Sequence, residues 1–420
     1  MPDEKHLLKS LFDKAVDAAQ AGILIPGSLP PAPTGTTIVV GAGKAAAAMA
    51  CAIEENWPGD LRGLVIVPYG HSLACDQIEV VEAAHPVPDE AGANAARRVM
   101  AMVQDLSADD LVLCLLSGGG SSLLSIPAGG VSLGEKQALT GALLKSGADI
   151  AEINCVRKHL SAIKGGQLAV ACFPAQVVTM AISDVVGDDA SVIASGPTVP
   201  DPTTSEMALD VLRRFDITAT DNVMAHLRNP ASETPKPGDS VFDNTEYLVL
   251  ATAADAMAAA EEAAREHGVE PLILGELEGD ATKLAIEHAE LARKTFDGSG
   301  PVNPPCVLIS GGETTVQVRG NGRGGRNSEY SLALALALDG HPGVHAIACD
   351  TDGIDGTEDN AGCYVTPDSL ERAERLSLNA KDLLQDNDSY YFFSETGGLI
   401  VTGPTRTNVN DFRAILIAGH

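Results

Sequence analysis

Two short glycine-rich segments each follow an apolar run in the first third of the chain. The segment 41–46 (GAGKAA) comes after 38–40, and 117–122 (SGGGSS) comes after 111–116. Glycine lets the backbone approach a ligand, and the N–H groups that start a following helix favour an anion. Both segments therefore predict phosphate or carboxylate recognition, with Lys44 adding a positive charge. The residues expected to bind a nucleotide here are Gly41, Gly43, Ser117, Gly118, Gly119, Gly120, Ser121 and Ser122.

The first segment also approximates the dinucleotide fingerprint GxGxxA, which is typical of nicotinamide enzymes. That fingerprint normally needs a carboxylate at the end of the next strand to bind the ribose. The next apolar run ends in Pro68, Tyr69 and Gly70, which argues against a nicotinamide cofactor. The second segment has neither the GK[ST] of a Walker loop nor the GxSxG of a hydrolase. An ordinary tight turn is the alternative for either segment alone.

A third glycine segment, 310–315 (SGGETT), follows an apolar run in the second half. Its Gly311, Gly312 and Glu313 repeat the pattern, so we add them to the expected nucleotide-binding residues. Because such loops occur in both halves, we expect a ligand to be held in a cleft between two domains.

Positive residues are scarce, and two segments concentrate some of them. The chain has 28 Lys and Arg against 57 Asp and Glu, a net charge of −29. Arg157, His159 and Lys164 precede a glycine pair and predict a local anion site for the substrate; a solvated helix face is the alternative. In 319–326 three arginines stand among glycines before a predicted helix. Such arginines, Arg326 above all, suit the clamping of a transferring phosphoryl group.

Three carboxylates, Asp184, Asp188 and Asp189, follow the apolar run 177–182. At the end of a strand they can hold a magnesium ion through oxygen ligands, or take a proton from a hydroxyl group. The alternative is that one of them caps a helix over 188–195.

A second acidic segment, 350–356 (DTDGIDG), follows an apolar run in the second half. It begins like a calcium-binding loop, but the twelfth position is Ala361 and no flanking EF-hand helices are apparent. Binding of a metal ion together with phosphate is a better interpretation of this segment. The expected Mg²⁺ ligands are Asp184, Asp189 and Asp352.

Length and composition exclude several classes of protein. At 420 residues the chain is long enough for two domains, and 45% apolar with 4% aromatic residues is ordinary for an α/β enzyme. The net negative charge disfavours nucleic acid and anionic membranes as partners. Eight cysteines without a CxxC spacing read as reduced, and neither a secretory signal nor a membrane-spanning run is present. A cytoplasmic protein is expected.

Apolar runs alternate with helix-like stretches, which predicts an α/β fold with a parallel sheet covered by helices on both faces. In the first half the pattern recurs at 36–55, 111–126 and 177–196, with a helix over 91–106. Over 215–245 the composition changes to Pro, Asn, Asp, Ser and Thr, the best candidate for a domain boundary. A second α/β unit then starts afresh, with strands in 246–256, 270–277, 305–318 and 343–356 and helices over 257–267, 281–295 and 327–338.

The segment 331–338 (SLALALAL) alternates with a period of two, which alone would suggest a strand. Ala and Leu favour helices, Asn327 or Ser328 can cap one, and Asp339 with Gly340 can end it. We therefore predict a buried helix.

These segments together resemble the type II glycerate kinase family, the glycerate 2-kinases with a MOFRL domain. The resemblance runs nearly end to end and is carried by eight ordered segments: 41–46, 117–124, 157–166, 182–201, 309–316, 324–329, 350–356 and 402–411. It implies a Rossmann-like, mostly parallel N-terminal domain, which we place at 1–238. A smaller α/β domain follows at 239–420, with the active site in the cleft between them.

The resemblance also implies transfer of the ATP γ-phosphoryl group to the 2-hydroxyl of D-glycerate, with Mg²⁺. The family's proposed catalytic Lys and Arg fall on Lys44 and Arg326. Ser328-Glu329-Tyr330 departs from the Gln-Glu-Phe or Gln-Glu-Leu common in the family and leaves Arg326 untouched. Members have also been named as NAD(P)H-dependent hydroxypyruvate reductases, the alternative that the missing ribose carboxylate argues against. A homodimer would be compatible with the sequence.

Our mechanistic hypothesis places Lys44 at the phosphates and Arg326 at the charge of the transition state. The segment 117–122 cradles phosphate oxygens, Asp184 and Asp189 organise Mg²⁺, and Arg157 or His159 binds the glycerate carboxylate. The base that takes the hydroxyl proton stays open among Asp184, Asp188 and Asp352.

Overall fold

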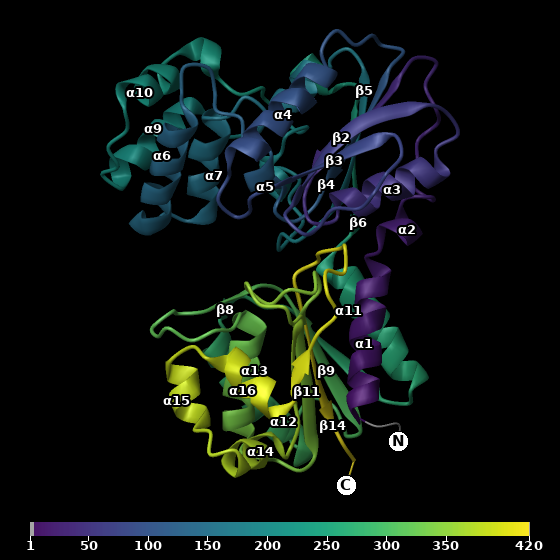
Figure 1. Ribbon diagram of the computed structural model, residues 1–420, viewed down its shortest axis with the longest axis vertical. Helices are drawn as coiled ribbons and strands as arrows, with labels where there is room; N and C mark the ends of the chain where they lie inside the picture. Colours follow the sequence, from purple (N-terminus) through teal and green to yellow (C-terminus); the bar gives the residue numbers. More distant parts are fainter. Residues whose placement is uncertain (1–3, 420) are drawn as a thin grey trace. The chain divides into compact units, whose positions relative to one another are not determined.

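The computed structural model describes residues 4–419 and divides into two compact units. The first unit comprises residues 21–250, and the second joins 4–20 to 251–419. Each unit has its own six-stranded sheet (Figure 1). The expected division at residues 238 and 239 thus differs from these units in two places: 239–250 belong to the first unit and 4–20 to the second.

The sheet of the first unit has the strand order β3-β2-β1-β4-β5-β6. Neighbouring strands from β3 to β5 pair in parallel. This is the order of the doubly wound α/β class, in which the chain reverses its direction of travel across the sheet after the third strand. The strands are β1 (Thr37–Ala42), β2 (Leu61–Pro68), β3 (Ile78–Ala83), β4 (Leu111–Leu116), β5 (Gln176–Ile182) and β6 (Thr245–Ala251).

Helices cover this sheet on both faces, as the continuous apolar strands require. One core cluster joins alternate residues of β1 and β4 to α4 (Glu90–Met102), α5 (Gly120–Leu123) and α8 (Gln167–Cys172). Helix α3 (Ala46–Asn56) contacts β2, β3 and β4 without contributing to that cluster, so it lies on the opposite face (Figure 1). The short α2 (Ala21–Leu24) contacts α3.

Four further helices of the first unit form a small core of their own beside the sheet (Figure 1). Leu139 and Leu143 pack there with Val156 and Val211. The helices are α6 (Leu133–Ser146), α7 (Ile150–His159), α9 (Ser205–Arg214) and α10 (Asp221–Leu227). From the sequence, the region of α7 was noted mainly for its cluster of cations, and α6 was not predicted.

The second unit is built on a mixed sheet of order β13-β12-β11-β14-β9-β7. Only β7 and β9 pair in parallel among its described pairs. The strands are β7 (Glu270–Glu276), β9 (Cys306–Gly311), β11 (Val344–Asp350), β12 (Gly362–Val365), β13 (Leu399–Ile400) and β14 (Asp411–Ile417). The short β8 (Gly279–Asp280) and β10 (Thr314–Thr315) form a separate pair.

Helices also cover both faces of this second sheet. On one face α1 (Glu4–Ala18) and α11 (Ala253–Glu266) pack together, and α1 contacts β11 and β14. The other face carries a core cluster with α12 (Ala281–Phe296) and α13 (Arg326–Leu338), as Figure 1 shows. The remaining helices are α14 (Ser369–Arg375), α15 (Ala380–Gln385) and α16 (Ser389–Thr396).

The fold class is confirmed, and most predicted elements are present. The segment 331–338 is helical within α13, which ends at Asp339 in the left-handed conformation. Two predictions were wrong. The strand in 246–256 does not start the second sheet, because β6 extends the first sheet beyond β5. No helix spans 188–195, where turns lead into a single 3₁₀ turn, Ile193–Ser195.

Candidate active site

The glycine loops after β1 and β4 lie side by side at the carboxyl ends of adjacent parallel strands. The backbone N–H of Lys44 donates to the carbonyl of Gly118 at 2.8 Å, and that of Ala45 donates to Ser117 Oγ at 2.9 Å. In a doubly wound sheet this is the switch point, where the chain leaves the two strands in opposite directions and ligands bind. The structure thus brings the first two predicted loops together.

Close approach explains why these loops need glycine. Gly43 has φ +137°, and a Cβ there would overlap Ser117 Oγ and the Ser117 carbonyl. Gly119 is left-handed at φ +82°, with its Cα facing the ring of His85. A Cβ on Gly41 would overlap the carbonyl of Leu115, so this glycine serves the pairing of β1 with β4.

Ser121, in the first turn of α5, is the point at which three separate segments meet. Its Oγ accepts from Arg157 Nη2 at 2.8 Å and from Lys164 Nζ at 3.0 Å. Lys164 Nζ also donates to the Ser121 carbonyl. The Ser195 hydroxyl lies 2.7 Å from the same Oγ. By contrast, Ser122 turns its hydroxyl back to the carbonyl of Gly119 and supports the loop from within.

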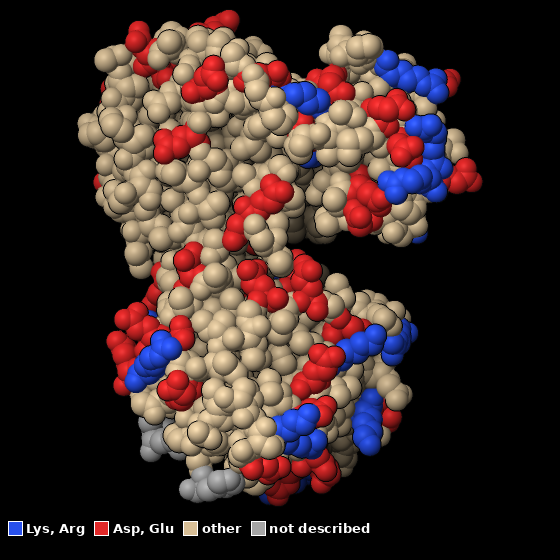
Figure 2. Space-filling model, turned by 180° about the vertical axis from the view of Figure 1, so that it is seen from behind, with Lys and Arg blue, Asp and Glu red and all other residues tan. Residues whose placement is uncertain are grey.

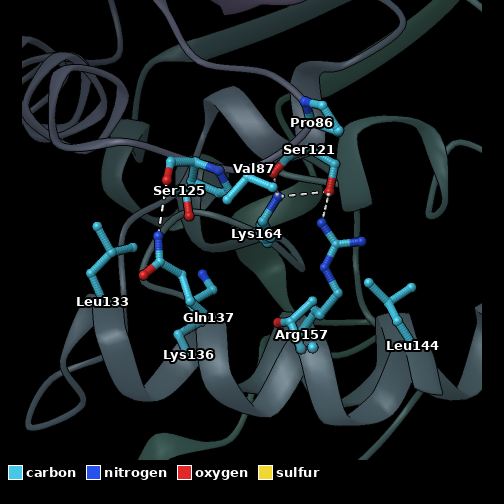
Figure 3. A pocket seen from close by; sticks show the side chains of 13 residues that line it. Pro86, Val87, Ser121, Ser125, Leu133, Lys136, Gln137, Leu144, Arg157 and Lys164 are labelled. Carbon is cyan, nitrogen blue, oxygen red and sulfur yellow. Dashed lines mark hydrogen bonds between the residues drawn. The ribbon is translucent and has the colours of Figure 1, made fainter. Parts of the chain in front are cut away.

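These cations line a cavity of about 170 Å³ in the first unit (Figure 3). Helix α6 forms one wall of it and contributes Lys136, which sequence analysis did not single out. The cavity is lined by Pro86, Val87, Pro88, Ser121, Ser125, Leu133, Lys136, Gln137, Thr140, Gly141, Leu144, Arg157 and Lys164. Three of these residues are basic and none is acidic, so the cavity is suited to an anion.

The cavity brings positively charged side chains close together, and two of them are buried. Lys136 is 5% exposed and Lys164 is 1% exposed. Burial, together with the nearby Arg157, lowers the pKa of the Lys136 ammonium to about 7. Burial, with Arg157 and Lys136, also lowers the pKa of Lys164 well below its usual value. An anion entering the cavity would relieve this repulsion.

The backbone beside the cavity is held in an uncommon conformation. Ala194 and Ser195 have φ of +50° and +63°, values that residues with a side chain rarely adopt. The N–H groups of Gly165 and Gly166 donate to the carbonyls of Ser195 and Gly196. This pairing fixes Lys164 and Ser195 on either side of Ser121, and strain of this kind is concentrated at functional sites.

His159 is separated from the other two predicted substrate-binding residues. It is buried, does not line the cavity, and has its ring nitrogens 2.8 Å from the Cys155 carbonyl and from Glu233 Oε1. Asp201 lies 3.9 Å from the ring. Both ring nitrogens are thus engaged inside the helical core, apart from Arg157 and Lys164, which line the cavity.

The acidic residues after β5 lie at the same edge of the sheet as the two loops. Asp184 is partly buried, and the Asp189 carboxylate accepts from the backbone of Ser191 at 2.8 Å. Within residues 4–419, no group of three or more His, Cys, Asp or Glu side chains is arranged to hold a metal ion. Asp352 lies in the second unit, where its carboxylate accepts from the N–H of Ile354 at 2.8 Å.

In the second unit, Arg326 begins α13 inside a ring of carboxylates. It contacts Glu313 at 2.6 Å, Asp350 at 2.9 Å and Asp411 at 2.8 Å. Burial acts to lower the pKa of Arg326, but Asp411 and Asp350 outweigh burial and raise it. This arginine is therefore rigidly placed and permanently charged.

The neighbouring loop 310–315 is held in place by hydrogen bonds from a buried arginine. The buried Arg413 donates to the Gly311 carbonyl at 2.7 Å and to the Gly312 carbonyl at 3.4 Å. Glu313, predicted at the nucleotide, pairs with Arg326. The wholly buried Asp355 accepts from the N–H groups of Asn327 and Ser328 and so caps α13. The predicted capping by the Asn327 or Ser328 side chain was wrong.

Lys136 and the contact of Ser195 with Ser121 complete the first-unit site and were not predicted from the sequence. Lys136 follows Ser132 and Glu135, which form a capping box at the start of α6. That S-x-x-E pattern was visible in the sequence and marks the helix. Ser195 falls in the segment 182–201, but its contact with Ser121 could not be predicted, because that contact depends on the left-handed turn at 194–196.

The fold and this site define a two-unit α/β protein that gathers anion-binding groups at the ends of parallel strands. Residues 7–228 match the family described as a domain of unknown function (DUF4147), and 306–411 match the MOFRL family. None of the helices in the described residues has the length and apolar character of a membrane span.

Relatives extend this similarity over the whole chain. A D-glycerate 2-kinase of Thermotoga maritima is 42% identical over 410 residues, 97% of each chain. A crystal structure of a glycerate kinase from that organism covers 99% of both chains with a TM-score of 0.90 and 41% identity. A protein of Agrobacterium vitis, whose name gives hydroxypyruvate reductase as a provisional activity, is 50% identical over 98% of this chain and 94% of its own. The chain belongs to the type II glycerate kinase family.

Proposed function

We propose that the chain transfers the γ-phosphoryl group of ATP to the 2-hydroxyl of D-glycerate, giving 2-phosphoglycerate and ADP. The observation that carries this proposal is the pairing of two anion-binding features through α5. The glycine loops beside Lys44 stand at its start, and the cavity with Arg157 and Lys164 lies beside its Ser121. The D-glycerate 2-kinase name of the Thermotoga relative supports the same activity.

The nucleotide phosphates are assigned to the loops after β1 and β4. Their glycines leave backbone within reach of phosphate oxygens, and Lys44 adds a charge at the switch point of a Rossmann-like sheet. Phosphoryl transfer asks a protein mainly to position its reactants and to neutralise charge. A lysine held beside two glycine loops serves both needs.

The acceptor acid is assigned to the cavity of Figure 3. Arg157 and Lys164 would hold its carboxylate, and the apolar side chains of Val87, Leu133 and Leu144 would contact its carbon chain. Both hydrogen bonds of the cations converge on Ser121, so an incoming carboxylate meets donors that are already oriented.

Mg²⁺ fits the residues at this edge of the sheet. It usually keeps several waters and takes one or two protein carboxylates besides phosphate oxygens. Asp184 and Asp189 would supply those carboxylates, and Asp352 is the ligand proposed from the second unit. When bound, the ion neutralises charge on the phosphate oxygens.

The general base is proposed among Asp184, Asp188 and Asp352. We retain Arg326 as the residue opposite the transition-state charge, and Gly311, Gly312 and Glu313 as nucleotide-binding residues. The role of Arg326 is also implied by the family resemblance, whereas Gly311, Gly312 and Glu313 are proposed from the repeated glycine pattern. We also propose a cytoplasmic location, since the eight cysteines are free thiols, as in reducing compartments.

A reductase is the alternative, and one assay separates the two activities. Purified protein is given MgATP and D-glycerate while ADP release is followed, with acceptor-free and L-glycerate reactions as controls. Parallel reactions contain NADH or NADPH with hydroxypyruvate. The proposal expects ADP release that depends on D-glycerate and no cofactor oxidation. Oxidation of NAD(P)H without glycerate-dependent ADP release would replace it with the reductase.

A further inference from the structure

Lys136 is a buried cation in the cavity that the roles above leave unused. It lies in the first turn of α6, a helix whose outer face is exposed at Lys145. Its side chain is 5% exposed overall, and its ammonium donates to the Ile126 carbonyl at 3.3 Å. A single long hydrogen bond to a neutral carbonyl compensates poorly for removing an ammonium from water.

The surroundings of Lys136 contain further positive charge and no negative charge. Of the residues that line the cavity, α7 contributes Arg157, and the loop after it contributes Lys164. No other charged residue lines the cavity among the residues contributed by 86–88, by 121–125 and by α6 itself. An anion placed among these three cations would make the arrangement favourable.

We propose that Lys136 is a substrate-binding residue whose ammonium joins Arg157 and Lys164 around the carboxylate of the acceptor acid, which therefore binds together with a proton. This inference rests on the proposed function for the identity of the acid. The chemistry is simple: the neutral amine, a proton from solvent and the carboxylate form an ion pair. No covalent bond changes except the new N–H bond.

The low pKa of Lys136, about 7, supports proton uptake. Near and above that pH much of the free protein carries the neutral amine, because burial and Arg157 oppose its charge. A bound carboxylate favours the ammonium and raises its pKa. By linkage, binding of the acid then weakens as the pH rises, by up to about tenfold per unit for one linked proton.

The form of the cavity favours the carboxylate of a short acid over a nucleotide phosphate. Its walls away from the cations are apolar, with Val87, Leu133 and Leu144, and its volume of about 170 Å³ suits a molecule of a few carbon atoms. The phosphate-binding features, the glycine loops and Lys44, lie at the other end of Ser117–Ser121.

The test is a calorimetric titration of the whole protein with D-glycerate alone, in two buffers of different ionisation enthalpy. At pH 8 the proposal expects net proton uptake on binding, and a Kd several-fold higher than at pH 6. K136M should lose part of the uptake and bind at least about tenfold more weakly at pH 6. K136R should keep binding at pH 8, since it stays charged there. K145M, altered on the same helix, should match the wild type.

Binding by K136M with wild-type affinity and wild-type proton uptake would overturn the proposal. A parallel titration with ADP and with inorganic phosphate distinguishes the source of the anion: uptake that depends on Lys136 for these ligands but not for D-glycerate also overturns it. Phosphorylation of D-glycerate by the wild type is measured separately. If phosphorylation occurs and the uptake is independent of Lys136, only this inference fails. If D-glycerate binds with uptake dependent on Lys136 but is never phosphorylated, only the proposed function fails.

Discussion

Ser121 shows how single residues organise this site. One hydroxyl accepts from Arg157 and Lys164 while it touches Ser195, so a serine sets the positions of two cations that would otherwise repel each other apart. Lys44, one loop away, has a different setting, since it is partly exposed beside the glycine loops. The two kinds of cation should therefore respond differently to substitution.

For Lys44 we expect K44M to lower kcat by about 10²- to 10³-fold with little change in Tm. The amine is proposed to stabilise charge on the transferring group, and the loss of one such donor has effects of this size. Steady-state kinetics and a thermal melt check it, with K145M as the matched control. A K44M variant that turned over nearly as fast as the wild type would remove Lys44 from the mechanism.

For Lys136 we expect K136M to be more stable than the wild type at pH 6. The folded-state pKa, about 7, lies below the unfolded value of about 10.4, so the unfolded chain binds more protons between these values. The wild type therefore gains stability as the pH rises from about 7 to 10, and below pH 7 it bears the full penalty. The substitution should raise the free energy of unfolding by up to about 4 kcal/mol at pH 6, and by less at pH 9.

Urea denaturation at the two pH values measures this difference. K145M should leave the free energy of unfolding unchanged, because its side chain is exposed. A K136M variant less stable than the wild type at pH 6 would show that the ammonium is not held at a penalty in the absence of ligand.

At the scale of elements, parallel β1 and β4 place their two loops together, and glycine permits the contact. We expect G43A to lose about 1–3 kcal/mol of stability and most of its activity, because its Cβ would overlap Ser117 and φ +137° is strained. G59A is the control, since nothing lies within 4 Å of a Cβ there. Denaturation and kinetics measure both variants. Wild-type activity in G43A would mean that the loops need no close approach.

The start of α13 depends on a residue 28 positions further along the chain. Asp355 accepts from Asn327 N at 2.9 Å and from Ser328 N at 2.8 Å. D355A would leave these buried donors unpaired, at about 2–4 kcal/mol. A thermal melt should show a clear loss of stability, while E374A, exposed on α14, should melt like the wild type. Equal melting temperatures would show that α13 needs no such cap.

Most of the elements could be predicted because their signals are local. The run 331–338 is a helix since Ala and Leu outweigh a period of two, and the strands before the glycine loops read directly from their apolar runs. The edge strand β6 could not be assigned to its sheet, because pairing with β5 is a long-range contact. Asp355 as a cap of α13 was hidden for the same reason.

The candidate site shows the same difference between local signals and long-range contacts. Glycines, Lys44, Arg157 and Lys164 could be found, because their types and spacing are unusual in so acidic a chain. The separation of His159 from Arg157 could not, since it depends on Glu233, a residue 74 positions away. Lys136 was missed although the capping box before it marks α6, because one lysine on a helix ordinarily lies in solvent.

At the scale of the whole molecule, Asp and Glu outnumber Lys and Arg. Figure 2 shows Asp and Glu spread over both units, with Lys and Arg fewer, as the net charge of −29 requires. Such a surface repels anionic substrates at long range. Recognition then depends on groups withdrawn from that surface, and the buried cations of the cavity meet this condition.

Mg²⁺ is proposed to bind together with the nucleotide, because this ion usually takes one or two protein carboxylates besides phosphate oxygens. Chelation with EDTA should therefore abolish phosphoryl transfer while leaving Tm unchanged, and added Mg²⁺ should restore the activity. Activity assays and melts before and after chelation measure this. A large fall in Tm on chelation would instead indicate a metal bound by the folded protein itself.

The most direct test of the central claim is to identify the phosphorylated product by ³¹P NMR after reaction with MgATP and D-glycerate. Phosphorylation at the 2-hydroxyl places one proton on the ester carbon, so the account predicts a phosphate monoester signal split into a doublet. A triplet, from the two protons of a 3-phosphate ester, or inorganic phosphate alone, would contradict it.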